Sequence, residues 1–157
     1  MAQGQMYAVS AVAVASPAAS WDLLELNTGS AKVTRLHSLY IGQTTDMGDA
    51  QAEALTVQFI TGHTTSGSGG TAPTPVALSA AFGAASATAE ANNTTIASTG
   101  TTAIRHADVW NIALPYQYRP TPEERIDLAP STRLVVRLSA PADTITTTFT
   151  AIFEEIG

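Results

Sequence analysis

The sequence predicts an all-β protein, a jelly-roll-like or Greek-key β-sandwich of about eight strands. Short segments alternate between apolar and polar residues, and clusters of Gly, Pro, Asn and Ser separate them. Only 13% of the residues are charged, about half the usual fraction, and Thr, Ser, Ala and Val dominate instead. At 157 residues the chain can bury a real core, and we expect one domain over residues 1–157 with a long loop at about 61–75.

The first half of the chain contains four expected strands, over residues 6–15, 21–26, 32–42 and 55–60. Alternation along the third places Leu39 and Ile41 on one face together with His37, and Leu36 on the other face. A polar connection follows over residues 43–53.

The second half begins with the Gly/Ser/Thr-rich loop, followed by an Ala/Thr-rich stretch to residue 102. The alanines favour a short helix over residues 79–90, although their Ser and Thr neighbours weaken it. Alternation returns over 104–118, with Ile104 on the same face as Trp110 and Ile112 and with breaks near Asp108 and Pro115. It also occurs over 134–138 and 145–153. The expected core residues are Leu39, Ile41, Leu55, Val57, Phe59, Trp110, Ile112, Leu134, Val136, Phe149 and Phe153.

Charge and composition exclude several classes of partner. The formal net charge is -6, Lys32 is the only lysine and the six arginines are scattered, so we expect no nucleic-acid partner. No apolar run reaches the roughly 18 residues of a membrane span, so we expect no membrane partner. The absence of cysteine rules out disulfides and thiolate metal sites.

No motif predicts catalysis, a cofactor or a metal ion. The histidines His37, His63 and His106 lack ligand spacing, and Asp46, Asp49 and Glu53 do not match a calcium loop. Carboxylate pairs for glycoside hydrolysis could be drawn from Glu90, Asp108, Glu123, Glu124 and Asp127, but nothing fixes their separation. A Gly-x-Ser-x-Gly elbow does not occur. We therefore expect a protein without enzymatic activity.

Two features leave a binding role open. Four aromatic residues, Trp21, Trp110, Tyr116 and Tyr118, could form a sugar-stacking platform of a glycan-binding module, or serve as core anchors. The run GSGG at residues 67–70 lacks the Gly-Lys-Ser/Thr ending of a nucleotide loop. We expect it to belong to a flexible surface loop that becomes ordered against a neighbouring subunit.

Four segments carry a resemblance to a known group of proteins: GDAQAE at 48–53, GSGGTAPTP at 67–75, PTPEER at 120–125 and FEEIG at 153–157. Together they resemble a family of small structural proteins of tailed phages and prophages. In size and composition the chain also resembles the jelly-roll-like decoration, or cement, proteins of phage heads.

This resemblance implies a virion protein on the outer surface of a capsid, with the major capsid protein as partner and a dimer or trimer as the oligomer. It implies no catalytic residue. A tail or fibre-associated β-sandwich subunit is the alternative. The residues expected at the interface lie in the segments 1–5, 61–75 and 120–125, and they are Met1, Gln3, Gln5, His63, Ser66, Ser68, Pro73, Pro75, Pro120, Pro122 and Arg125.

Overall fold

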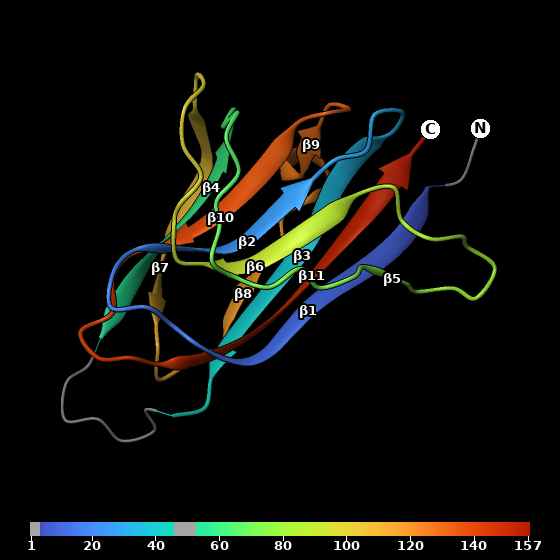
Figure 1. The fold of residues 1–157 in the computed structure, drawn as a ribbon. Coiled ribbons are helices and arrows are strands. Elements are labelled where there is room, and N and C mark those ends of the chain that lie inside the picture. Colours follow the sequence, from blue (N-terminus) through green and yellow to red (C-terminus); the bar gives the residue numbers. More distant parts are fainter. Residues whose placement is uncertain (1–3, 46–52) are drawn as a thin grey trace.

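The computed structural model of the chain describes residues 4–45 and 53–157, and nearly all of its regular structure is β (Figure 1). Its strands are β1 (Gln5–Ala15), β2 (Trp21–Asn27), β3 (Val33–Gln43), β4 (Ala54–Thr61), β5 (Val76–Ala77), β6 (Thr88–Asn93), β7 (Ala103–Asn111), β8 (Tyr116–Tyr118), β9 (Ile126–Leu128), β10 (Arg133–Leu138) and β11 (Thr146–Ile156). One 3-10 turn, η1 (Pro122–Glu124), lies between β8 and β9. None of the helical structure in these residues is long and apolar enough to cross a membrane.

Two antiparallel sheets pack face to face. Sheet A has the order β5-β1-β11-β3-β8, with β9 also paired to β3, and sheet B has the order β6-β2-β10-β4-β7. The first strand, β1, therefore pairs with the last, β11, and β2 pairs with β10. With β5 and β6 set aside, this is the order of a jelly roll, so the predicted fold class is confirmed.

The core fills the space between the two sheets, and every residue expected there is buried. Trp110, Val57 and Phe153, for example, are at most 1% exposed. The alternation is cleanest in β11, whose odd-numbered residues from 147 to 155 are buried while the even-numbered ones lie partly exposed on the outer face. Burial of alternate apolar side chains is thus what fixes the strand faces.

Two bulges correct the face assignments made from strict alternation. In β3 the pairing with β11 shifts between Leu36 and Ser38, so that Leu36 and Leu39 are both buried. In β7 a shift beside Arg105 turns Ile104 onto the outer face, where it is 56% exposed. A bulge inserts one unpaired residue and reverses the side of every residue beyond it.

The expectations for the short elements were less accurate. Residues 79–90 form no helix; a turn is followed by β6. The stretch 104–118 is divided between β7 in sheet B and β8 in sheet A, because the turn around Pro115 carries the chain from one sheet to the other. With the short strands β5, β6 and β9, the described part of the chain contains eleven strands.

Candidate functional site

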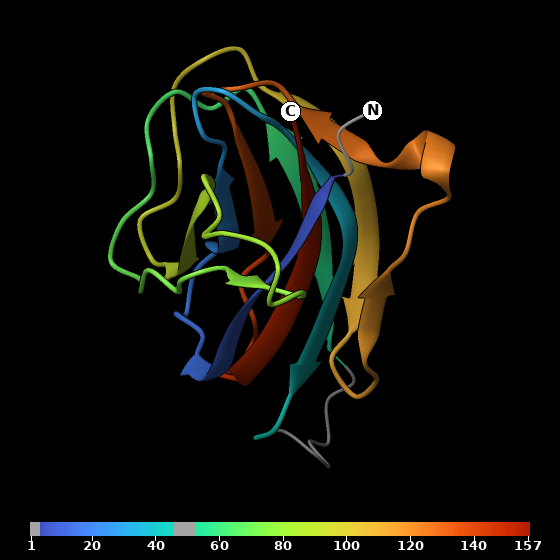
Figure 2. The ribbon, with the colours of Figure 1, turned by 90° about the vertical axis from the view of Figure 1, so that its right-hand side faces the viewer.

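A long insertion, residues 62–102 between β4 and β7, covers one side of the sandwich (Figure 2). It adds the outermost strand to both sheets, since β5 pairs with β1 and β6 pairs with β2. Its Gly-rich part runs antiparallel to its own later part through the bridges Thr65–Ser98, Ser68–Thr95 and Thr71–Ala91. The expected flexible loop is instead hydrogen-bonded within its own chain, which is a correction to the sequence interpretation.

A buried carboxylate, Glu25 of β2, holds the Gly-rich part of the insertion. It accepts hydrogen bonds from the Ser66 hydroxyl at 2.5 Å and from the Gly67 amide at 2.9 Å. The Arg133 guanidinium of β10 lies 2.7 Å away and balances its charge. Glu25 is fully buried, so these bonds replace the water that an exposed carboxylate would bind.

Two further buried carboxylates repeat this arrangement. Asp22 accepts a bond of 2.6 Å from the Ala97 amide and pairs with Arg137. Glu155 accepts a bond of 2.7 Å from the Ala87 amide and pairs with Lys32, at 3.1 Å.

Each carboxylate therefore binds a main-chain N–H of the insertion on one side and a cation of the sandwich on the other. Burial alone would raise the pKa of Glu155, but the bonds from Ala87, Ser86 and Lys32 outweigh it and hold that pKa below its ordinary value.

A small apolar cluster completes the attachment of the insertion. Ile60 and Val135 point out of sheet B, and Ala97 of the insertion covers them, so that all three are at most 5% exposed. Strand β2 is buried on both faces for the same reason, from Trp21 to Leu26. The insertion thus behaves as a fixed part of the fold.

The residues expected at an interface are spread over several parts of this structure. Met1 and Gln3 lie outside the described residues, and Gln5 accepts bonds from Tyr7 and Lys32. In the insertion, the Ser66 hydroxyl binds Glu25, and the Ser68 amide binds the Thr95 carbonyl. His63 lies half-buried. Pro73 and Pro75 border a shallow groove. Pro122 is the first residue of η1, and Pro120 and Arg125 lie on either side of this turn. The Thr121 amide at its start donates a hydrogen bond to the Glu124 carboxylate.

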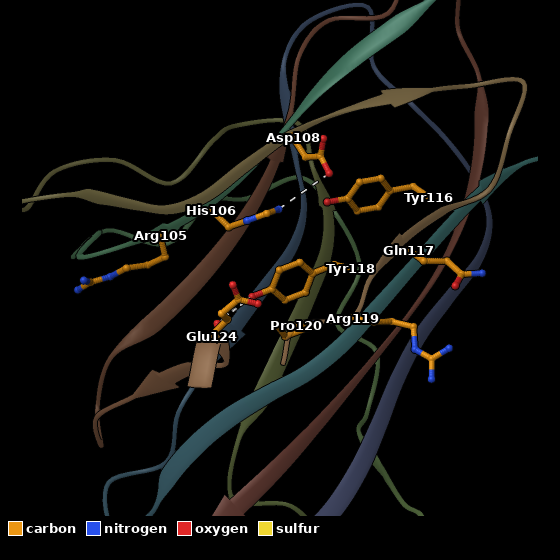
Figure 3. A pocket seen from close by; sticks show the side chains of 9 residues that line it. All are labelled: Arg105, His106, Asp108, Tyr116, Gln117, Tyr118, Arg119, Pro120 and Glu124. Atoms are coloured by element: carbon orange, nitrogen blue, oxygen red, sulfur yellow. Dashed lines mark hydrogen bonds and ion pairs between the residues drawn. The ribbon is translucent and has the colours of Figure 1, made fainter. Parts of the chain in front are cut away.

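A groove of about 460 Å³ lies at the opposite edge of the sandwich, where β7 and β8 are the outermost strands (Figure 3). His106 and Asp108 face it from β7, and Tyr116 and Tyr118 face it from β8. The Asn111–Leu114 turn between these strands is held by the Trp110 indole, which donates to the Leu114 carbonyl at 2.7 Å. Glu124 of η1 and the nearby Pro120 border the other end.

The polar groups of the groove lie close together. The Nε2 atom of His106 is 4.0 Å from an Asp108 carboxylate oxygen, and the His106 ring packs on the Tyr118 ring with centroids 4.9 Å apart. Tyr118 donates a long hydrogen bond of 3.4 Å to the Glu124 carbonyl.

Burial is the main cause that raises the pKa of Tyr116, and the nearby Asp108 carboxylate raises it further. Burial and Glu124 raise the pKa of Tyr118. Both phenols therefore keep their protons at neutral pH.

The four aromatic residues considered as a platform do not form one. Trp21 and Trp110 are at most 1% exposed in the core, which is the alternative role that the sequence left open, while Tyr116 and Tyr118 lie at the groove with their rings buried.

Of the carboxylates considered as pairs, Asp108 and Glu124 border the same groove, whereas Asp127 pairs with Arg35 and Glu90 binds Asn93. Asp46 and Asp49 lie outside the described residues, and within residues 4–45 and 53–157 no three His, Asp or Glu side chains are placed to hold a metal ion.

Comparison with known proteins finds no matching family model, no similar curated protein and no similar solved structure. The functional argument therefore rests on the geometry described above. The sequence did contain one signal of the buried anchors: Asp22 and Glu25 interrupt an otherwise apolar strand, WDLLEL at 21–26. Acidic residues in such a strand indicate buried partners.

Proposed function

We propose that this chain is a non-enzymatic virion protein that decorates the outer surface of a tailed-phage head. In this role it binds the major capsid protein as a homo-oligomer, a dimer or a trimer, and stabilises the contacts between capsomers. The observation that carries the proposal is the insertion 62–102, which three buried carboxylates fix to the sandwich. A surface fixed in advance loses little conformational entropy on binding.

The outward surface of the insertion suits contact with another protein. Among residues 62–102, Glu90 is the only Asp, Glu, Lys or Arg, so few charges would have to be desolvated on docking. Val76, Leu78 and Ile96 of the insertion are exposed large apolar side chains, whereas Ile104, Val109 and Leu114 lie on β7 and the turn after it, at the opposite edge of the sandwich. Exposed apolar side chains of the insertion can serve as contacts in an interaction surface.

The phage assignment itself comes from the sequence segments that resemble tailed-phage structural proteins. A decoration protein must bind a repeating surface, which favours a rigid body with several contact segments. The jelly roll supplies the rigid body, and the insertion supplies a broad contact surface of nearly neutral charge.

The test is co-sedimentation of the purified chain with phage heads that lack it, together with its mass in solution by light scattering. We expect saturable binding at a fixed ratio to capsid subunits. Leu78→Asp should weaken binding by roughly tenfold or more, because a charge would replace an exposed apolar contact.

Val12→Asp is the matched control, since Val12 is an apolar side chain of β1, 71% exposed and outside the insertion. Binding to purified tails and not to heads would favour the tail-subunit alternative, and binding to neither would refute a virion role.

A further inference from the structure

The groove between β7 and β8 has a polar border with no net charge. Its charged side chains are two arginines, Arg105 and Arg119, and two carboxylates, Asp108 and Glu124, so that their charges cancel. In Figure 3 the two arginines lie on opposite sides, with the carboxylates, His106 and the tyrosines between them. Such a border favours neither a cation nor an anion, but it offers hydrogen-bond donors and acceptors together.

A buried hydroxyl at this groove lacks a hydrogen bond. Tyr116 is only 7% exposed, and its hydroxyl has no partner within the described structure. Figure 3 shows that this hydroxyl points towards Asp108. A buried hydroxyl without a partner is destabilising and uncommon, and a ligand bound in the groove would supply the missing partner.

We propose that this groove binds a carbohydrate, with Asp108 and Glu124 accepting hydrogen bonds from sugar hydroxyls and His106 and Tyr116 completing the polar contacts. The volume of about 460 Å³ falls within the range of small-molecule sites, roughly 300–1,000 Å³. Because the rings of Tyr116 and Tyr118 are buried, recognition is by polar groups and not by stacking. The site lies at the edge of the sandwich opposite β5 and β6, away from these strands of the insertion that the proposed function assigns to capsid binding.

The experiment is an NMR titration of the isotope-labelled chain with four probes, the methyl pyranosides of glucose, galactose, mannose and N-acetylglucosamine. A parallel titration with arginine amide tests whether the groove binds a basic side chain instead. We expect at least one pyranoside to shift amide signals of β7, β8 and η1, and arginine amide to leave them unchanged.

Two variants test the assigned groups. Asp108→Asn should weaken sugar binding by roughly tenfold or more, the usual loss for a charged acceptor. The Asp108 side chain is 55% exposed, so the fold should be retained. Asp143→Asn, which alters an exposed carboxylate away from the groove, is the matched control and should bind as the unaltered chain does.

Tyr116→Phe separates a binding role from a structural one. Since the hydroxyl has no partner in the free chain, its removal should leave the melting temperature unchanged or raise it, while weakening sugar binding. A lower melting temperature would mean that the hydroxyl makes a structural bond, and would overturn its assignment. The carbohydrate site would be refuted by no shifts with all four pyranosides, by shifts that persist in Asp108→Asn, or by shifts with arginine amide alone.

Discussion

Replacement of Glu25 by alanine tests whether the buried carboxylates fix the insertion to the sandwich. The side chain accepts bonds from Ser66, Gly67 and Arg133 at 2.5, 2.9 and 2.7 Å, and all three are lost in Glu25→Ala. Removing one partner of a buried ion pair costs about 3–5 kcal/mol, because the other charge is left without compensation. The Arg133 side chain is 19% exposed and gains some hydration, so we expect a value near the lower end, about 3 kcal/mol.

The assay combines urea unfolding with amide hydrogen exchange at Gly67. A domain of this kind has about 5–15 kcal/mol of stability, so the variant should remain folded in water. We expect a lower free energy of unfolding and faster exchange at the Gly67 amide, which loses its acceptor. Exchange in β11, which belongs to sheet A, should follow only the global loss of stability.

Glu123→Ala is the control for removal of one negative charge, because Glu123 is exposed in η1 and should change stability by less than about 0.5 kcal/mol. A loss below about 1 kcal/mol in Glu25→Ala, or unchanged exchange at Gly67, would refute the anchoring role of the carboxylate.

Three further predictions concern pH, strand face and backbone shape. The folded pKa of Glu155 lies below its ordinary value of 4.5, so its contribution to stability is present above about that pH and is lost as the pH falls further. When the free energy of unfolding is measured with urea at a series of pH values, Glu155→Gln should reduce its dependence on pH in this acidic range. Val57→Asp should cost about 3 kcal/mol or more by the same assay, whereas Thr56→Asp on the outer face should be tolerated, and equal effects would show the face assignment to be wrong. Gly62→Ala should lower the stability by about 1–3 kcal/mol in thermal unfolding, because Gly62 has a φ of +93° and a Cβ would meet the Thr101 carbonyl. In the control Gly83→Ala the added Cβ meets nothing, so the stability should not change. Similar melting temperatures for the two variants would contradict this account.

The core could be predicted from the sequence because one physical rule decides it. Val57 and Phe149 are buried where period-two alternation places them, since a strand that packs on one face must bury alternate residues. The faces of Leu36 and Ile104 could not be predicted, because a bulge leaves no trace in the apolar pattern. Period-two alternation carries no information on where an extra residue enters the pairing between two strands.

The attachment of the insertion could not be predicted for a different reason. Its anchors join main-chain amides to carboxylates far away in the sequence, as between Gly67 and Glu25 or between Ala87 and Glu155. Any residue except proline has such an amide, and the Ser66 and Ser86 hydroxyls that bind beside them do not stand out from the other serines of the insertion. The groove could not be predicted from the sequence either, because Asp108 and Tyr116 come together only after the chain passes from sheet B to sheet A.

The use of main-chain amides as attachment points has an evolutionary consequence. At Gly67, Ala87 and Ala97 the sandwich binds the backbone of the insertion, so the exposed side chains between these points do not determine how it is held. Selection can therefore exchange them, and alter which surface is recognised, while the scaffold beneath stays unchanged. In the same way, short foreign peptides grafted beside Gly83, where an added side chain meets nothing, should be displayed without loss of the fold if the Gly83 carbonyl keeps its bond from the Tyr7 hydroxyl.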